Sequence, residues 1–166
     1  MTTSQTPTDL RKIIGETLRA FIFAYKDGGE QNDPAIINRD VTADCTRHLL
    51  PASLATSLGA PADFVISNDE YQKLFAADLK AGSVQKIVIS NLTIDVEARK
   101  AAATTVSDMV FKDGETIVME HSWILDFTED GSKVKKVIEF CDPTSVHQML
   151  AKVHAGDQEA VLQPEQ

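Results

Sequence analysis

Hydrophobic residues change their spacing at Gly82. Before Gly82 they recur at steps of three and four, which is typical of helices with one apolar face, and after it they alternate with polar residues, as in strands. The spacing predicts helices within residues 7–29, 32–41, 67–82 and 143–153, and strands within residues 83–98, 99–112, 115–128 and 132–142. This order predicts an α+β domain with N-terminal helices packed in the concave face of a curved antiparallel sheet, a cone-shaped α+β barrel.

Start and stop signals bound the predicted helices. Thr8 or Asp9 can cap the first helix, and Gly28-Gly29 is expected to end it. Ser67 or Asn68 can cap the helix before Gly82, and residues 52–64 are consistent with a loop or a helical turn. The expected apolar stripe of that helix comprises Tyr71, Leu74, Phe75 and Leu79.

The strand predicted within residues 115–128 has one polar interruption on its apolar face. Every second residue from Ile117 to Phe127 is bulky and apolar except His121. Such a histidine is either a hydrogen-bonded core residue or a group that moves protons, because burial and nearby carboxylates shift its pKa in opposite directions around neutral pH. The pattern leaves both interpretations open.

The turn at residues 130–131 sets the expected neighbours of His121. If this Asp-Gly pair forms a two-residue turn, Met119 faces Asp142 and His121 faces Phe140. Asp142 then lies diagonal to His121, about 7–8 Å away at the backbone, where its carboxylate can orient the imidazole. Asp142 is also well placed to cap the helix that follows it.

The Asp-Gly pair at residues 113–114 leaves two registers open. A two-residue turn places Asp108 opposite Met119, on the same face as His121. A three-residue turn with a glycine bulge places Ser107 opposite Met119 and directs Asp108 outward. Both faces of this strand are partly apolar, so the pattern favours neither register.

Composition excludes several classes of function. The chain has 166 residues, which suits one domain, and we expect residues 9–153 to form it, between a flexible N-terminus (1–8) and a polar C-terminal tail (154–166). The formal charge of −9, without a basic cluster, disfavours nucleic acid and anionic membranes as partners. We expect a cytoplasmic protein, because neither a secretory signal nor a membrane-spanning stretch is visible and the two cysteines have no metal-ligand spacing.

Three segments, "DCTRHLLPASL", "SNDEY" and "VIEFCD", resemble the SnoaL-like branch of the nuclear transport factor 2-like superfamily, especially small fungal members of secondary-metabolite pathways. The resemblance covers residues 9–153. It implies a cone fold, frequent homodimers through the sheet, and a cavity in which a histidine or carboxylate moves protons without metal or cofactor. It also implies that His48 faces the cavity. Lys26 follows Tyr25 where scytalone dehydratase-like relatives have a Tyr-Asp pair, which disfavours a dehydratase.

These observations support the hypothesis of a cofactor-free isomerase or cyclase that acts on an apolar, oxygenated metabolite of polyketide or terpenoid type. The alternative is a non-catalytic module of the same fold that binds a small molecule or mediates a dimeric interaction. The expected catalytic residues are His121, Asp142, His48 and Asp108, and the expected pocket residues are Tyr25, Tyr71, Met119, Trp123 and Phe140. No metal ligands are expected.

Overall fold

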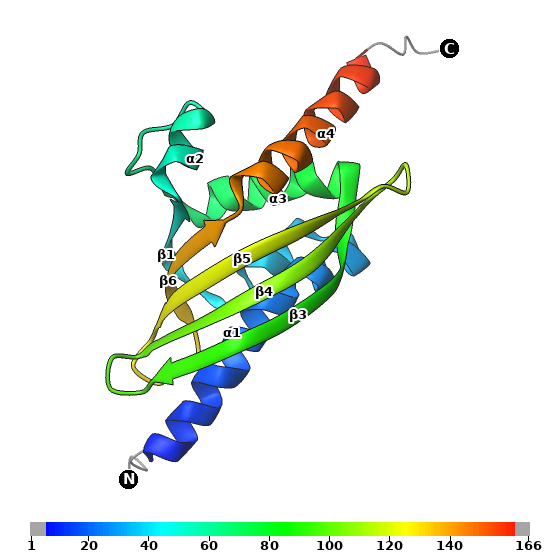
Figure 1. Cartoon of the computed structure of the whole chain (residues 1–166). Helices are drawn as coiled ribbons and strands as arrows, with labels where there is room; N and C mark the ends of the chain where they lie inside the picture. Colours follow the sequence, from blue (N-terminus) through cyan, green and yellow to red (C-terminus); the bar gives the residue numbers. More distant parts are fainter. Residues whose placement is uncertain (1–5, 162–166) are drawn as a thin grey trace.

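A curved sheet wraps around the long first helix (Figure 1). The computed structural model describes residues 6–161, including the side chains of residues 6–155. The helices are α1 (Pro7–Gln31), the 3-10 helix η1 (Pro34–Asn38), α2 (Ala52–Ser57), α3 (Asn68–Ala81) and α4 (Pro143–Val161). The strands are β1 (Val41–Leu50), β2 (Val65–Ile66), β3 (Gly82–Asp95), β4 (Lys100–Phe111), β5 (Thr116–Phe127) and β6 (Val134–Cys141).

The strands of the described chain form one sheet in the order β2-β1-β6-β5-β4-β3. All neighbouring strands run antiparallel except β1 and β6, which run parallel. α1 lies behind β3, β4 and β5 in Figure 1, along the concave face of the sheet. The predicted α+β architecture is therefore confirmed. Among residues 6–161, no helix is long and apolar enough to cross a membrane.

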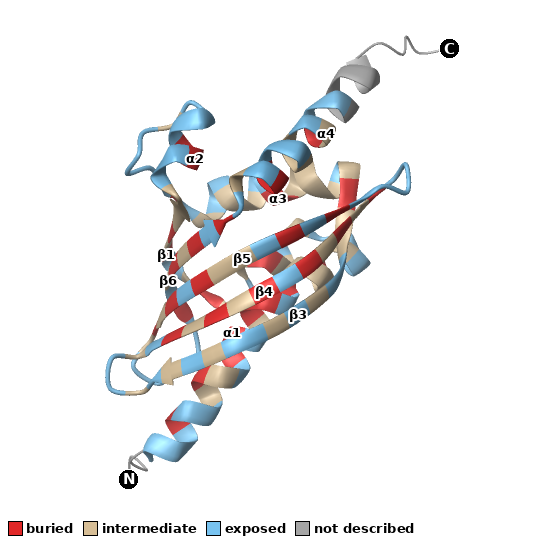
Figure 2. Cartoon of the chain, in the orientation of Figure 1, coloured by how far each residue is buried: buried red, intermediate tan, exposed pale blue. Residues whose placement is uncertain are grey.

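The main core lies between α1 and the strands β5 and β6. Figure 2 shows buried positions alternating with intermediate or exposed ones along β4 and β5, so that one face of the sheet carries the core. Complete burial of a large aliphatic or aromatic side chain contributes about 1.5–3 kcal/mol. The core side chains of these elements include Leu10, Ile14, Leu18, Phe21 and Ile22 of α1, Trp123, Leu125 and Phe127 of β5, and Val134 and Val137 of β6.

α1 is longer than the sequence predicted. Its N-cap is Thr6, not Thr8 or Asp9: the Asp9 backbone N–H donates to Thr6 Oγ1 at 3.1 Å, and the Asp9 carboxylate completes a capping box. The helix continues through Gly28-Gly29 and ends at Asn32, which has the left-handed conformation (φ 50°) that ends many helices.

Gly28 and Gly29 serve close packing and do not end α1. A Cβ atom on Gly28 would lie 2.6 Å from the Phe75 ring of α3, and one on Gly29 would lie 2.7 Å from Ser83 Cβ of β3. Both separations are far below the optimal carbon–carbon distance of about 3.5–4.0 Å. The predicted stop was wrong because the contacts that require these glycines come from elements distant in sequence.

α3 is capped as predicted, but its buried stripe is narrower. Ser67 Oγ accepts the Glu70 backbone N–H, within a capping box. Tyr71, Phe75 and Leu79, at steps of four, form a cluster with α1 and η1. Leu74 is 53% exposed, so its expected place on this stripe was wrong. The apolar contacts of α3 with α1 and η1 therefore come from the i, i+4, i+8 row.

The segment between α1 and α3 differs from the predicted one. Residues 34–38 form a 3-10 helix, in which Asp33 Oδ1 accepts the Ala35 backbone N–H at 2.9 Å. β1 occupies residues 41–50, where the spacing predicted no strand. α2 is the helical turn that was one of two expectations for residues 52–64.

The last helix, α4, begins at Pro143 as predicted and continues to Val161. The predicted polar tail (154–166) is therefore helical from His154 to Val161, and its residues 162–166 lie outside the described chain. Residues 1–5 of the predicted flexible N-terminus (1–8) also lie outside the described chain, whereas Pro7 and Thr8 belong to α1.

The register of β5 and β6 differs from the predicted one by one residue. Phe127 pairs with Val134 as predicted, but a register shift follows directly, and from there His121 pairs with Cys141 and not with Phe140. The residues of β6 that face inward are therefore the odd-numbered ones beyond this shift, not the even-numbered ones. This single correction decides which β6 side chains lie beside His121.

The shift avoids burying a lysine. In the predicted register Lys136 faces Leu125 in the core, and a buried ammonium without a partner is costly. The bulge instead pairs Lys136 with Asp126 on the outer face of the sheet and pairs Val137 with Leu125. Val137 and Leu125 are both completely buried, so the bulge restores an apolar inner face.

The second open register is also resolved. Ser107 pairs with Met119, which corresponds to the alternative with the longer turn, and Asp108 pairs with Val118. On its other side, Asp108 pairs with Lys86 of β3, and both residues lie on the outer face of the sheet. The expectation that Asp108 joins His121 on the inner face was therefore wrong.

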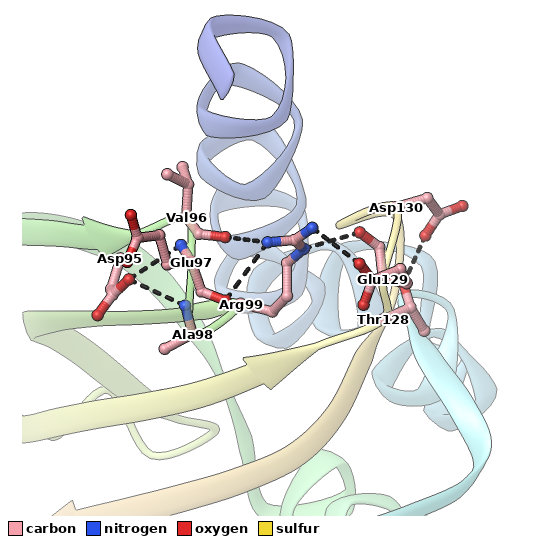
Figure 3. A network of polar contacts seen from close by, with 8 residues as sticks. All are labelled: Asp95, Val96, Glu97, Ala98, Arg99, Thr128, Glu129 and Asp130. Atoms are coloured by element: carbon pink, nitrogen blue, oxygen red, sulfur yellow. Dashed lines mark hydrogen bonds and ion pairs between the residues drawn. The ribbon is translucent and has the colours of Figure 1, made fainter. Parts of the chain in front are cut away.

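Arg99 connects the β3–β4 turn to the loop after β5 (Figure 3). Its guanidinium donates to the Glu129 backbone oxygen at 2.9 Å and to Glu129 Oε1 at 2.8 Å, and it also bonds the Val96 carbonyl. In the same loop Asp130 Oδ1 accepts the Thr128 hydroxyl at 2.7 Å. These contacts hold together the two loops at the end of the sheet nearest the N-terminus.

Candidate active site

Glu139 of β6 and His121 of β5 form the centre of the candidate site. Beyond the β6 bulge, Glu139 pairs with Trp123 and Cys141 pairs with His121, all on the inner face. His121 Nε2 lies 3.4 Å from Glu139 Oε1, and Cys141 Sγ lies 3.9 Å from the same oxygen. The His121 and Glu139 side chains are only 12% and 11% exposed. The sheet thus presents an imidazole–carboxylate pair in a largely buried position.

Two tyrosines extend this pair toward the helices. The hydroxyls of Tyr25 (α1) and Tyr71 (α3) lie 2.6 Å apart, and Tyr71 donates to Glu139 Oε2 at 3.0 Å. Because Tyr71 has one hydroxyl proton, Tyr25 is the donor between the tyrosines. Burial, reinforced by the negative charge of Glu139, raises the pKa of both tyrosines, so they remain protonated donors.

Trp123 orients His121. The two rings stack with centroids 5.2 Å apart and planes 24° from parallel. The indole Nε1 donates to Thr105 Oγ1 of β4 at 2.9 Å, in a buried hydrogen bond. Phe21 and Tyr25 of α1 also contact the Trp123 ring, at centroid distances of 5.7 and 5.6 Å. His121 therefore lies against an aromatic wall that is held by both the sheet and α1.

Arg47 of β1 supplies a buried positive charge. It is 1% exposed, and its Nη2 donates to the Ile37 carbonyl and to Asn38 Oδ1, both at 3.0 Å. Its Cζ lies 4.2 Å from the centroid of the Tyr71 ring and 5.6 Å from that of Phe21. A guanidinium over aromatic faces is electrostatically attracted to them, so Arg47 fixes Tyr71 relative to β1 and η1.

Asp78 of α3 is a second carboxyl group in this region. It lies two helical turns after Tyr71 and is half-buried. Burial raises the pKa of Asp78 to about 7, and the negative charge of Glu139 adds to this effect. A carboxyl group that exchanges its proton near neutral pH is suited to general acid–base catalysis.

The cluster can bind and protonate an oxygen or remove a proton. Tyr25, Tyr71, Asp78 and His121 are partly buried, since each keeps a minor share of its surface exposed. A side chain keeps exposed surface only where water or a small ligand can touch it. The hydroxyl protons of Tyr25 and Tyr71 are donated to Tyr71 and to Glu139 Oε2. Asp78 can donate a proton, whereas Glu139 and the neutral form of His121 accept protons. Donors and proton acceptors thus lie side by side among aromatic rings.

His48 lies on the other face of the sheet. It pairs with Ile138 of β6, and burial together with the charge of nearby Lys136 lowers its pKa. Because side chains alternate along a strand, its neighbour Arg47 faces inward instead. The expectation that His48 faces the interior was therefore wrong by one position.

Asp142 caps α4 and does not orient His121. Its two carboxylate oxygens accept the backbone N–H groups of Thr144 and Ser145, each at 3.1 Å. These hydrogen bonds lower the pKa of the exposed Asp142 carboxyl group. The capping role was one of the two roles open from the sequence, and Glu139 takes the place next to His121.

The expected pocket residues separate into two groups. Phe140 is 49% exposed on the outer face, so the expectation that it lines the interior was wrong, for the register reason given above. Met119 and Trp123 are buried on the inner face, and Tyr25 and Tyr71 belong to the cluster. The four inward residues come from the long apolar periodicities of α1, α3 and β5.

The sequence did not predict three residues of the candidate site, although the sequence pattern around two of them could have indicated their positions. Glu139 could have been found because the predicted register buries Lys136, which argues for a bulge. Asp78 follows Phe75 by three residues and Tyr71 by seven, so it interrupts an apolar stripe. Arg47 left no signal, because the spacing did not identify β1.

A separate surface hollow of about 520 Å³ lies at the end of the sheet nearest the N-terminus. Its lining includes Leu10, Arg99, Glu129 and Ser132. Arg99 and Glu129 bond to each other there (Figure 3). This open hollow contains neither a half-buried imidazole nor a raised carboxyl pKa, so the candidate site is the cluster around Glu139.

No protein-family model matches the sequence, and no curated protein matches it. Solved structures match the fold. The BvnE pinacolase from Penicillium brevicompactum has a TM-score of 0.67 at 19% identity, over 89% of this chain and 99% of that chain. PrhC from Penicillium brasilianum has a TM-score of 0.67 at 19% identity, over 86% of this chain and 91% of that chain.

A nuclear transport factor 2-like protein of unknown function from Burkholderia pseudomallei has a TM-score of 0.56 at 7% identity, over 82% of this chain and 96% of that chain. The chain has the nuclear transport factor 2-like fold. At these identities the likeness establishes the fold alone. It confirms the fold that the three sequence segments implied, and it places this fold among structures that include a pinacolase.

Proposed function

We propose that the chain is an acid–base isomerase or cyclase that requires no cofactor for proton transfer. The observation that carries the proposal is the His121–Glu139 pair, with Nε2 and Oε1 3.4 Å apart in a largely buried position. Tyr71 holds the other oxygen of Glu139. Groups positioned in this way accelerate proton transfer by about 10²–10⁴-fold.

Each group has a role in removing a proton beside a carbonyl and returning it elsewhere. Glu139, or neutral His121, accepts the proton from carbon. Tyr25 donates to Tyr71, which donates to Glu139 Oε2, so this hydrogen-bonded chain stabilises the carboxylate of Glu139. Asp78, with a pKa of about 7, supplies or accepts the second proton. The same steps lead to isomerisation or ring closure, depending on the carbon that receives the proton or bond.

The surroundings favour an apolar, oxygenated substrate of polyketide or terpenoid type. Trp123, Phe21 and Phe75 surround the polar groups with aromatic surface, and such sites bind mostly by burying apolar area. A few fixed donors then orient the oxygens of the ligand. The BvnE pinacolase from Penicillium brevicompactum shares the fold.

We also propose that the chain forms a homodimer through the outer face of the sheet. Exposed apolar side chains gather there on four neighbouring strands, which is typical of interaction surfaces. They are Val88, Val106, Val118, Ile124 and Phe140. The formal charge of −9 argues against nucleic acid as the partner of this surface.

The test is turnover of cyclic ketones and enones by the Glu139→Gln variant. We expect its kcat to fall by about 10²–10⁴-fold, because the amide keeps the size of the carboxylate but accepts no proton. Glu120→Gln is the matched control, since Glu120 is exposed on the outer face of the same sheet beside His121. Unchanged kcat in Glu139→Gln with normal folding contradicts the proposal and favours the ligand-binding module.

A further inference from the structure

We propose that His121, Glu139 and Cys141 form a binding site for zinc or another thiophilic divalent cation. The three residues belong to adjacent strands and share the inner face, because Cys141 pairs with His121 and Glu139 lies two residues before Cys141. One donor atom of each lies within 4.8 Å of the other two. No spacing in the sequence indicated this set, since residue 121 is separated from residues 139 and 141 by a hairpin.

The distances fit tetrahedral coordination. Zinc binds imidazole nitrogen, thiolate sulfur and carboxylate oxygen at about 2.0–2.3 Å, so tetrahedral donors stand about 3.4–3.6 Å apart. Nε2 of His121 and Oε1 of Glu139 are 3.4 Å apart, and Sγ of Cys141 is 3.9 Å from Oε1. The donors are therefore within a few tenths of an ångström of the required separations for the two pairs that involve Oε1. The third pair, Nε2 of His121 and Sγ of Cys141, lies within 4.8 Å.

The donor chemistry selects the class of metal. A thiolate and an imidazole favour zinc, cobalt or copper over calcium and magnesium, which prefer oxygen ligands. With Glu139 and Cys141 as anions and His121 neutral, a divalent cation gives a site with no net charge. Charge balance matters here because Cys141 is 1% exposed and an unbalanced buried charge is costly.

Neighbouring residues hold the side chains of the proposed ligands in place. Tyr71 donates to Glu139 Oε2, which leaves Oε1 as the oxygen that faces both His121 and Cys141. Trp123 stacks on the His121 ring and limits its rotation. Hydrogen bonds and packing of this kind orient metal ligands and raise metal affinity. Three protein ligands leave a fourth position for water or a ligand.

Metal binding and proton transfer compete in this site. A cation on Oε1 and Nε2 occupies the atoms that exchange protons in the proposed function, so it inhibits turnover, and this consequence alone rests on that function. Binding itself does not depend on it. The experiment therefore measures coordination and not activity.

The test is titration of the full chain, freed of metal by a chelator, with cobalt(II) chloride alone and then zinc chloride. We expect one cobalt per chain, with a thiolate-to-cobalt charge-transfer band that zinc removes. Cys141→Ser should lose the band, whereas Cys45→Ser should keep it, because Cys45 is the other free buried thiol of the described chain. Tyr71→Phe should keep the band and weaken affinity by about 10–100-fold.

Absence of the band in the wild-type chain, or its persistence in Cys141→Ser, overturns the proposal. If Cys141→Ser does not fold, as judged by circular dichroism, X-ray absorption of the zinc-loaded wild-type chain decides. One sulfur ligand with nitrogen and oxygen ligands supports the site, and oxygen and nitrogen ligands alone show adventitious binding and overturn it.

Discussion

Glu139 connects four groups through one carboxylate. Oε2 accepts the Tyr71 hydroxyl, and Oε1 faces His121 and Cys141. Its negative charge also raises the pKa of Asp78, after the larger effect of burial. Asp78, with a pKa of about 7, therefore exchanges its proton near neutral pH close to a second carboxyl group that faces His121.

The pKa of Asp78 predicts a pH-dependent stability. It rises from 3.8 to about 7 on folding, so the folded chain retains a proton between these values that the unfolded chain releases. Asp78 therefore lowers the free energy of unfolding as the pH rises through this window, by at most about 4 kcal/mol above pH 7. We expect Asp78→Asn to stabilise the chain at pH 8 relative to the wild type, and less at pH 5.

Urea unfolding at pH 5 and pH 8 measures this difference. Asp69→Asn is the control, because Asp69 is an exposed carboxylate in the first turn of the same helix. Equal effects of Asp78→Asn at the two pH values would show that the Asp78 carboxyl group is not desolvated.

At the scale of elements, the contact between α1 and α3 brings the tyrosines together. Tyr25 and Tyr71 can share a hydrogen bond because Gly28 lets the Phe75 ring lie directly against α1. The β6 bulge makes the opposite side of the site by directing Glu139 inward. The Gly28–Phe75 contact and the β6 bulge add no functional group themselves, but they set the distances between Tyr25, Tyr71 and Glu139.

Gly28→Ala should destabilise the chain. An added methyl group improves helix propensity by about 1 kcal/mol, but it must displace the Phe75 ring from 2.6 Å, and overpacking costs typically about 1–3 kcal/mol. We expect a net loss of up to about 2 kcal/mol in thermal or urea unfolding.

Gly15→Ala in the same helix is the matched control. A Cβ atom there meets only Ile94 Cδ1, at 3.4 Å, so we expect a gain of about 0.5–1 kcal/mol. If both variants stabilise the chain, the α1–α3 contact is looser than described.

At the scale of the whole molecule, the two faces of the sheet differ in composition and exposure. Its inner face holds the core and the polar cluster, and its outer face exposes apolar residues between charged pairs such as Lys100–Asp126. The bulge in β6 serves both surfaces, because the same shift that turns Glu139 inward turns Phe140 outward.

Val106→Asp should convert the proposed homodimer into a monomer. Val106 is 43% exposed at the middle of the outer face, where it pairs with Val88, and a buried unpaired carboxylate at an interface is costly. Sedimentation velocity measures the mass. Leu74→Asp is the control, because Leu74 is similarly exposed on α3, away from the sheet. A wild-type monomer, or dissociation in both variants, would refute a dimer through this face.

The spacing of apolar residues within single segments was sufficient to predict most of the helices and strands. The apolar stripe of α1 and the alternation along β5 depend on side chains within one element, so the sequence predicted both, together with the buried position of His121. The caps of α3 and the start of α4 were equally local. β1 was not predicted, because its burial depends on pairing with β6, which follows it by more than eighty residues.

By itself, the sequence determined the fold class and the inward direction of His121, since both follow from periodicity within continuous segments. Only the tertiary structure decided the partners of His121. A one-residue bulge exchanged Phe140 and Asp142 for Glu139 and Cys141, and the alternation along β1 exchanged His48 for Arg47. The physical reason is that side chains alternate between faces, so a shift of one residue reverses every assignment beyond it. Such a shift is set by the burial of the whole sheet and not by the residues next to the turn.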